Sequence, residues 1–139
     1  MFKKILVASD GSEHAIRAAE KAATLAKLEK DAIIEIVYVV DDATSKSDVL
    51  RNWEAVDIES KRKALLNTTE EICRKAGVSF ETKIIHGEPG PAIVKHANEN
   101  HVDLVVIGSR GLNSLQEMVL GSVSHKVAKR ANCPVMIIK

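Results

Sequence analysis

The chain has 139 residues with a net charge of +1, and its aromatic residues are one Trp, one Tyr and two Phe. This length suits a single domain with its own core, so we expect one domain over residues 1–139. The balanced charge and the scarcity of aromatic rings argue against a nucleic-acid-binding surface or base-stacking platform.

Neither export nor membrane insertion is indicated by the sequence. The apolar run Ile5–Ala8 is shorter than the core of a signal peptide, and no segment approaches the length of a membrane span. Cys73 and Cys133 lack the spacing of a paired redox or metal motif. We therefore expect a reduced, cytoplasmic protein that does not enter a membrane.

The first elements in chain order are a strand, a helix and a second strand. Lys3–Ala8 is a short apolar run typical of a buried strand. Alanines then recur at helical spacing from Ala15 to Ala26, and Ser12 is placed to cap that helix. The run Ala32–Val40 predicts the second strand, and the polar stretch 41–48 predicts a loop.

A second helix and a third strand follow. Apolar residues recur at helical spacing from Ile58 to Ala76, Trp53 and Val56 continue that spacing backwards, and Gly77 ends the helix. Ser79–Ile85 is rich in β-branched and aromatic residues and predicts the third strand.

The last part of the chain predicts two more helices and two more strands. Pro91 suits the first position of a helix that runs to about Asn100. Val102–Ile107 is a continuous apolar run and predicts the fourth strand. A fourth helix is expected over residues 123–131, followed by the final strand Pro134–Ile138.

The alternation of strands and helices predicts an α/β fold. Right-handed crossovers would give an open, doubly wound sheet of five parallel strands with helices on both faces. If the strand order is 3-2-1-4-5, the winding reverses between the first and fourth strands, and ligands bind at the carboxyl ends of strands at such a point. Asp10 and Gly108 directly follow those two strands.

The segment after the fourth strand, GSRGLNSLQEMVLGSVS, has the glycine spacing of a phosphate site. Gly108 and Gly111 could adopt positive φ and let amides approach a ligand, while Gly121 and Ser122 open a helix whose N–H groups favour an anion. A Walker A loop would need a lysine before Ser122, and a dinucleotide fingerprint would read G-x-G-x-x-G. Neither motif is present.

This spacing of G-x-x-G, nine residues and G-S resembles the nucleotide-binding signature of the universal stress protein family, specifically its ATP-binding branch. The resemblance extends over the whole chain. Its pieces, in chain order, are K-K-I-L-V-A-S-D-G-S from Lys3, V-V-D from Val39, H-G-E-P from His86, V-D-L-V-V-I-G-S-R-G from Val102, L-G-S-V-S from Leu120 and C-P-V-M-I-I from Cys133.

The resemblance implies a set of nucleotide-binding residues. Asp10, beside Ser9, would face the adenine or ribose, although an aspartate after a first strand is also a common turn residue. Arg110 would contact a terminal phosphate or lie in solvent. The base would lie against Ala8, Val39 and Ile107, and the ribose and phosphates against Gly108, Gly111, Gly121, Ser122, Val123 and Ser124.

The resemblance further implies a regulatory module that binds ATP, or ADP or AMP, with any Mg²⁺ or Mn²⁺ held through the phosphates. Hydrolysis is expected to be slow or absent, because no acid is placed by a motif to orient water. A metal-dependent nucleotide hydrolase or phosphotransferase, and a dimeric scaffold without nucleotide, are the alternatives. The uncharged last strand, Pro134–Ile138, favours a homodimer, and the sequence does not identify a protein partner.

Overall fold

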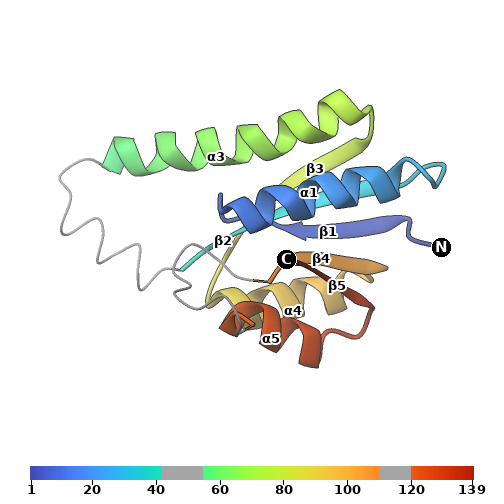
Figure 1. Ribbon diagram of the computed structural model, residues 1–139. Helices are drawn as coiled ribbons and strands as arrows, with labels where there is room; N and C mark the ends of the chain where they lie inside the picture. Colours follow the sequence, from blue (N-terminus) through green and yellow to red (C-terminus); the bar gives the residue numbers. More distant parts are fainter. Residues whose placement is uncertain (42–54, 110–119) are drawn as a thin grey trace.

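The computed structural model describes residues 1–41, 55–109 and 120–139 (Figure 1). In chain order its elements are β1 (Lys4–Ala8), α1 (Glu13–Ala26), β2 (Ile33–Val40), α3 (Ala55–Ala76), β3 (Ser79–His86), α4 (Pro89–Glu99), β4 (Leu104–Gly108), α5 (Ser122–Arg130) and β5 (Val135–Ile138).

The strands form one five-stranded sheet of order β3-β2-β1-β4-β5, in which every neighbouring pair is parallel. Helices α1 and α3 lie over one face of this sheet, and α4 and α5 lie over the other (Figure 1). The predicted fold class and strand order are therefore confirmed. The winding reverses between β1 and β4, so their carboxyl ends meet at the expected ligand-binding edge.

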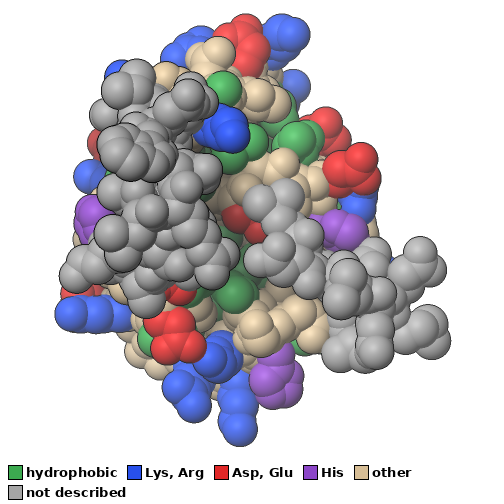
Figure 2. Space-filling model, turned by 90° about the vertical axis from the view of Figure 1, so that its left-hand side faces the viewer, with side chains coloured by type: hydrophobic (Ala, Val, Ile, Leu, Met, Phe, Trp, Pro, Cys, Tyr) green, Lys and Arg blue, Asp and Glu red, His purple; other side chains and the backbone are tan. Residues whose placement is uncertain are grey.

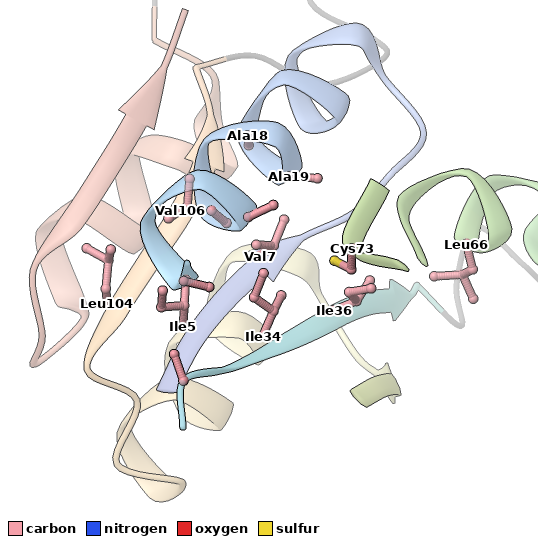
Figure 3. Packing of buried hydrophobic residues seen from close by; sticks show 14 residues of the cluster. Ile5, Val7, Ala18, Ala19, Ile34, Ile36, Leu66, Cys73, Leu104 and Val106 are labelled. Atoms are coloured by element: carbon pink, nitrogen blue, oxygen red, sulfur yellow. The ribbon is translucent and has the colours of Figure 1, made fainter. Parts of the chain in front are cut away.

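Both faces of the central strands are buried, which explains their continuous apolar sequences. Ile5, Leu6 and Val7 of β1 have no exposed surface, and Val105 and Val106 of β4 have none either. Alternate side chains enter two separate cores, one under α1 and α3 (Figure 3) and one under α4 and α5. The parallel pairing of β1 with β4 places the carboxyl ends of these two buried strands side by side.

Helix α1 packs closely on the sheet because its inward face consists of alanines. Six alanines from Ala15 to Ala26 are buried. The helix begins as predicted, since Ser12 is its N-cap and accepts a hydrogen bond from the Ala15 N–H at 3.2 Å. The start of α1 is thereby held beside the carboxyl ends of β1 and β4.

Several element boundaries differ from those predicted. Helix α4 begins at Pro89 rather than Pro91, and Glu88 before it is extended with ψ 130°, the conformation that a following proline favours. Helix α3 begins at Ala55, Trp53 lies outside the described residues, and Gly77 ends the helix with φ +72° as expected.

The last two strands also differ slightly. β4 runs from Leu104 to Gly108, so the glycine belongs to the strand, and β5 begins at Val135. The loop predicted over 41–48 lies, beyond Asp41, outside the described residues. Among the residues that the structure describes, no helix is long and apolar enough to cross a bilayer.

Candidate functional site

A cavity of about 460 Å³ lies at the carboxyl ends of the central strands. Its walls come from the ends of β1, β2 and β4 and from the N-terminal parts of α1, α4 and α5. Figure 2 views this end of the molecule, where hydrophobic and acidic side chains are visible near the centre. The cavity therefore lies where the winding of the sheet reverses.

The turn after β1 forms one wall of the cavity. The Ser9 N–H donates to the Val37 carbonyl at 2.9 Å, and one carboxylate oxygen of Asp10, Oδ1, accepts from the Ser12 N–H at 2.9 Å. The second bond is the turn contact that is common for an aspartate here. Asp10 thus has a structural role, while its side chain also lines the cavity.

Helix α3 holds this turn from outside the cavity. The buried hydroxyls of Ser9 and Thr69 are 3.1 Å apart, within hydrogen-bonding distance. Gly11 has φ +82°, and a Cβ on it would collide with a methyl carbon of Leu65. The backbone that carries Asp10 is therefore fixed by close packing.

Gly108 is required for a different reason from the one predicted. The sequence allows positive φ at Gly108, yet among the described glycines only Gly11, Gly77 and Gly87 have it, and Gly108 ends β4. A Cβ on Gly108 would lie 2.6 Å from the Cβ of His14 and 2.9 Å from its carbonyl carbon. The glycine lets α1 approach the end of β4.

The first turn of α5 forms the opposite wall, and the helix itself does not use the amide groups of that turn. Gly121 is the N-cap, with φ −61° and ψ 153°, and provides no side-chain cap. The first intrahelical bond runs from the His125 N–H to the Gly121 carbonyl at 2.9 Å. The N–H groups of residues 122–124 therefore have no partner within the helix, which is the arrangement that binds anions.

Ser124 ties this helix to the sheet. Its buried hydroxyl donates to the Gly108 carbonyl at 2.6 Å. The Gly121 N–H donates to the Ser109 carbonyl at 2.7 Å. These two bonds hold the start of α5 against the end of β4, so the Ser124 side chain helps to position the helix.

The structure brings the predicted nucleotide-binding residues together. Every one of them that is described lines this cavity, and Arg110 and Gly111 lie outside the described residues. That these residues bind a nucleotide stays a prediction. The full described set is Ala8, Ser9, Asp10, Val39, Ile107, Gly108, Gly121, Ser122, Val123 and Ser124.

Sequence reasoning missed part of the lining. Val37 and Tyr38 of β2 contribute, as do Pro89 and Ile93 of α4. Val37 and Tyr38 could have been predicted to line the site, because they lie near the predicted carboxyl end of the second strand at Val40. The predicted start of α4 at Pro91 leaves Pro89 outside the helix. Ile93 lies within the predicted helix, but the sequence alone does not show which face of that helix lies over the cavity.

The described lining is poor in charge. Asp10 carries the one carboxylate in this described lining, and the described lining contains no lysine or arginine. Within the described part of the chain, no three His, Cys, Asp or Glu side chains are grouped to hold a metal ion. The described walls thus offer amides, hydroxyls and apolar surface.

Solved structures share this architecture over nearly the whole chain. The universal stress protein UspA from Lactobacillus plantarum is 26% identical, with a TM-score of 0.82, and the match covers 99% of this chain and 98% of that one. A universal stress protein from Archaeoglobus fulgidus in complex with dAMP is 29% identical, with a TM-score of 0.73 and full coverage of both chains. A universal stress protein in complex with cAMP is 27% identical, with a TM-score of 0.74, covering 99% and 96%.

Sequence comparison gives the same result. Universal stress protein YxiE from Bacillus subtilis is 39% identical over 153 aligned positions, which cover all of both chains. The model of the universal stress protein family matches residues 1–139. With the fold and the cavity described above, these matches show that the chain belongs to the universal stress protein family.

Proposed function

We propose that this protein binds ATP in the cavity between β1, β4 and α5 and acts as a nucleotide-dependent regulatory module. The observation that carries the proposal is the first turn of α5, whose amides have no intrahelical partner and which opens a cavity lined by the predicted residues. Support also comes from family members that bind dAMP and cAMP, both adenine nucleotides.

The cavity suits the two ends of a nucleotide. The side chains of Val39, Ile107 and Ile93 offer apolar surface for a base, and the Ser122 and Val123 amides offer donors for phosphates. ADP or AMP could use the same donors. Mg²⁺ or Mn²⁺, if bound, would be held through the phosphate oxygens.

Retention of ATP fits this site better than its hydrolysis. Fast phosphoryl transfer needs a positioned water, a metal clamp and a cation at the γ-phosphate. One oxygen of Asp10, the carboxylate in the described lining, is already bonded to the Ser12 N–H. We therefore expect turnover far below the roughly 1 to 1,000 per second of dedicated enzymes.

The enzyme alternative can be separated from the binding module by turnover measurements on homogeneous protein with ATP and Mg²⁺. Rapid ADP release that is lost in Asp10→Asn would favour a hydrolase. Slow or undetectable release with retained ATP supports the binding module.

The proposal is tested by mass spectrometry of small molecules released from protein purified without added nucleotide, together with equilibrium ATP binding. We expect an adenine nucleotide to be released, and Gly121→Val to abolish ATP binding while the circular dichroism spectrum stays native. Unchanged affinity in the folded variant would contradict the proposed phosphate site. Absence of any bound or bindable nucleotide would favour the scaffold alternative.

We further propose a cytoplasmic homodimer that pairs through β5. This edge strand consists of Val135, Met136, Ile137 and Ile138, all half-buried and uncharged. The other edge, β3, has exposed Glu81 and Lys83, charges of the kind that discourage strand pairing. The apolar edge is therefore the better surface for a second copy.

A further inference from the structure

An ion pair that the sequence analysis did not anticipate lies beside the cavity. The Lys126 ammonium of α5 is 3.0 Å from a carboxylate oxygen of Glu88. Glu88 is the N-cap of α4 but makes no side-chain cap bond, and the next residue, Pro89, lines the cavity. The pair therefore links the start of α4 to the second turn of α5 at the margin of the cavity.

Gly90 allows the lysine to reach this position. A Cβ on Gly90 would lie 3.0 Å from Cδ and 3.2 Å from Cβ of Lys126. The aliphatic part of the lysine thus crosses α4 where that helix has no side chain. Lys126 remains 39% exposed and Glu88 64% exposed, so water surrounds much of the pair.

Lys126 also shares a helix face with a predicted phosphate ligand. It follows Ser122 by four residues, so the two side chains are neighbours on α5. Side chains on a helix tilt toward its N-terminus, which directs Lys126 toward the turn that opens into the cavity. Figure 2 shows Lys and Arg side chains gathered at the lower margin of this end of the molecule, the side on which α4 and α5 lie.

We propose that Lys126 selects nucleotides by their phosphate charge, exchanging Glu88 for the β- or γ-phosphate when a di- or triphosphate enters the cavity. The inference rests on the proposed function. The Lys126 ammonium would supply the described site with a cation, which the described lining of the cavity lacks. A monophosphate would end at the amides of residues 122–124 and leave the ion pair intact.

The exchange is physically favourable because the starting pair is weak. Exposed lysine–carboxylate pairs contribute little to stability, since both groups are well solvated when apart. A phosphate already held by helix amides offers the ammonium a more highly charged partner at fixed position. The Glu88 carboxylate, by contrast, opposes the entry of an anion into the cavity.

The test measures the affinities of ATP, ADP and AMP for the intact protein by isothermal titration calorimetry, with and without charge changes. Lys126→Met removes the charge but keeps the aliphatic stem over Gly90. We expect it to lower the ratio of ATP to AMP affinity by about three- to tenfold, with AMP affinity unchanged. Lys126→Arg should retain the wild-type ratio, and Glu88→Gln should raise it.

Lys129→Met is the matched control, because it removes the same charge from α5 one turn farther from Ser122. It should leave the ratio at the wild-type value. A folded Lys126→Met variant with the wild-type ratio would overturn the role of Lys126 while leaving the proposed function in place. If Lys129→Met lowered the ratio of ATP to AMP affinity equally, the effect would come from net charge alone, and the role of Lys126 would again be overturned. A wild-type protein that binds none of the three nucleotides would overturn the proposed function itself, and this role with it.

Discussion

At the scale of single residues, both the fold and the candidate site depend on Gly108 having no Cβ atom. Replacing it with alanine would place a Cβ 2.9 Å from the His14 carbonyl carbon, and that backbone can move only if α1 moves. We expect Gly108→Ala to lower the free energy of unfolding by about 1 to 3 kcal/mol, measured by urea denaturation.

Gly90→Ala is the control for this substitution. Its new Cβ would lie 3.0 Å from Cδ and 3.2 Å from Cβ of Lys126, so its nearest contacts are longer than the 2.6 Å at Gly108 and are made with side-chain atoms rather than with backbone. Alanine also suits a helix better than glycine does. Equal destabilisation by the two variants would show that close packing at Gly108 is not special.

Cys73 gives a prediction for alkaline pH. Burial raises the pKa of this thiol from 9.0 to about 11, with a further contribution from the charge of Glu70. In the folded protein the Cys73 thiol therefore keeps its proton at a pH at which the same thiol in the unfolded chain has lost it. This contribution to stability is fully present below about pH 9 and is lost as the pH rises toward 11. Over that range the free energy of unfolding falls by up to about 1.4 kcal/mol per pH unit.

The measurement is the free energy of unfolding of wild type and Cys73→Ala between about pH 8 and pH 10. The wild-type value should fall more steeply with pH than that of the variant. Parallel curves would show that the Cys73 thiol titrates alike in both states.

The position of the site residues could be predicted from the sequence better than their roles could. Apolar runs fix where β1 and β4 end, so Asp10 and Gly108 could be placed beside each other. The contact between Gly108 and His14 could not be predicted, because it depends on how closely α1 packs on the sheet. The bond from the Ser124 hydroxyl to the Gly108 carbonyl is long-range in the same way.

At the scale of elements, α4 is joined to the sheet by a buried polar network. Glu35 of β2 is only 4% exposed, and its carboxylate is 2.8 Å from His96 Nε2 and 3.8 Å from the Lys4 ammonium. Asn100 donates to the His96 carbonyl at 2.8 Å. The position of α4, whose first turn lines the cavity, therefore depends on a satisfied buried carboxylate.

Removing one partner should be costly. We expect His96→Ala to lower the free energy of unfolding by about 2 to 4 kcal/mol, because it leaves the Glu35 carboxylate buried with one partner fewer. Urea denaturation measures the loss, and His125→Ala, which truncates an exposed histidine of α5, is the control.

The double variant Glu35→Leu/His96→Leu should recover much of that stability, since it removes the buried charge together with its partner. A His96→Ala variant as stable as His125→Ala would contradict this account of the network.

The fold class could be predicted because continuous apolar runs indicate parallel strands covered on both faces. The strand order 3-2-1-4-5 was predicted as that of a doubly wound sheet, and the structure has that order. The start of α4 could not be predicted, because the sequence EPGP contains two prolines and each of them suits the first position of a helix. The extended backbone of Glu88 decides for Pro89. The partner of Glu35 was equally beyond prediction, since it depends on which turn of α4 faces β2.

For the whole molecule, the dimer proposal predicts different effects of a charge on the two sheet edges. Ile137→Glu on β5 should convert a dimer to monomers by sedimentation at micromolar concentration, because the new carboxylate would have to be buried between paired strands. Ile84→Glu on β3, where the side chain is 52% exposed, is the matched control and should leave the dimer intact. A monomeric wild-type protein would contradict the proposal, as would a folded, dimeric Ile137→Glu variant.

The central claim is that backbone amides at the start of α5 bind the phosphates of an adenine nucleotide, and proline at position 122 tests it most directly. Gly121 is extended, with ψ 153°, as a residue before proline must be, and proline suits the first position of a helix, so Ser122→Pro should leave α5 in place. It removes the amide donor together with the hydroxyl, whereas Ser122→Ala removes the hydroxyl alone. Isothermal titration with ATP should give Ser122→Ala an affinity within about threefold of wild type and Ser122→Pro a loss of about tenfold or more. Wild-type affinity in a folded Ser122→Pro variant would contradict the claim.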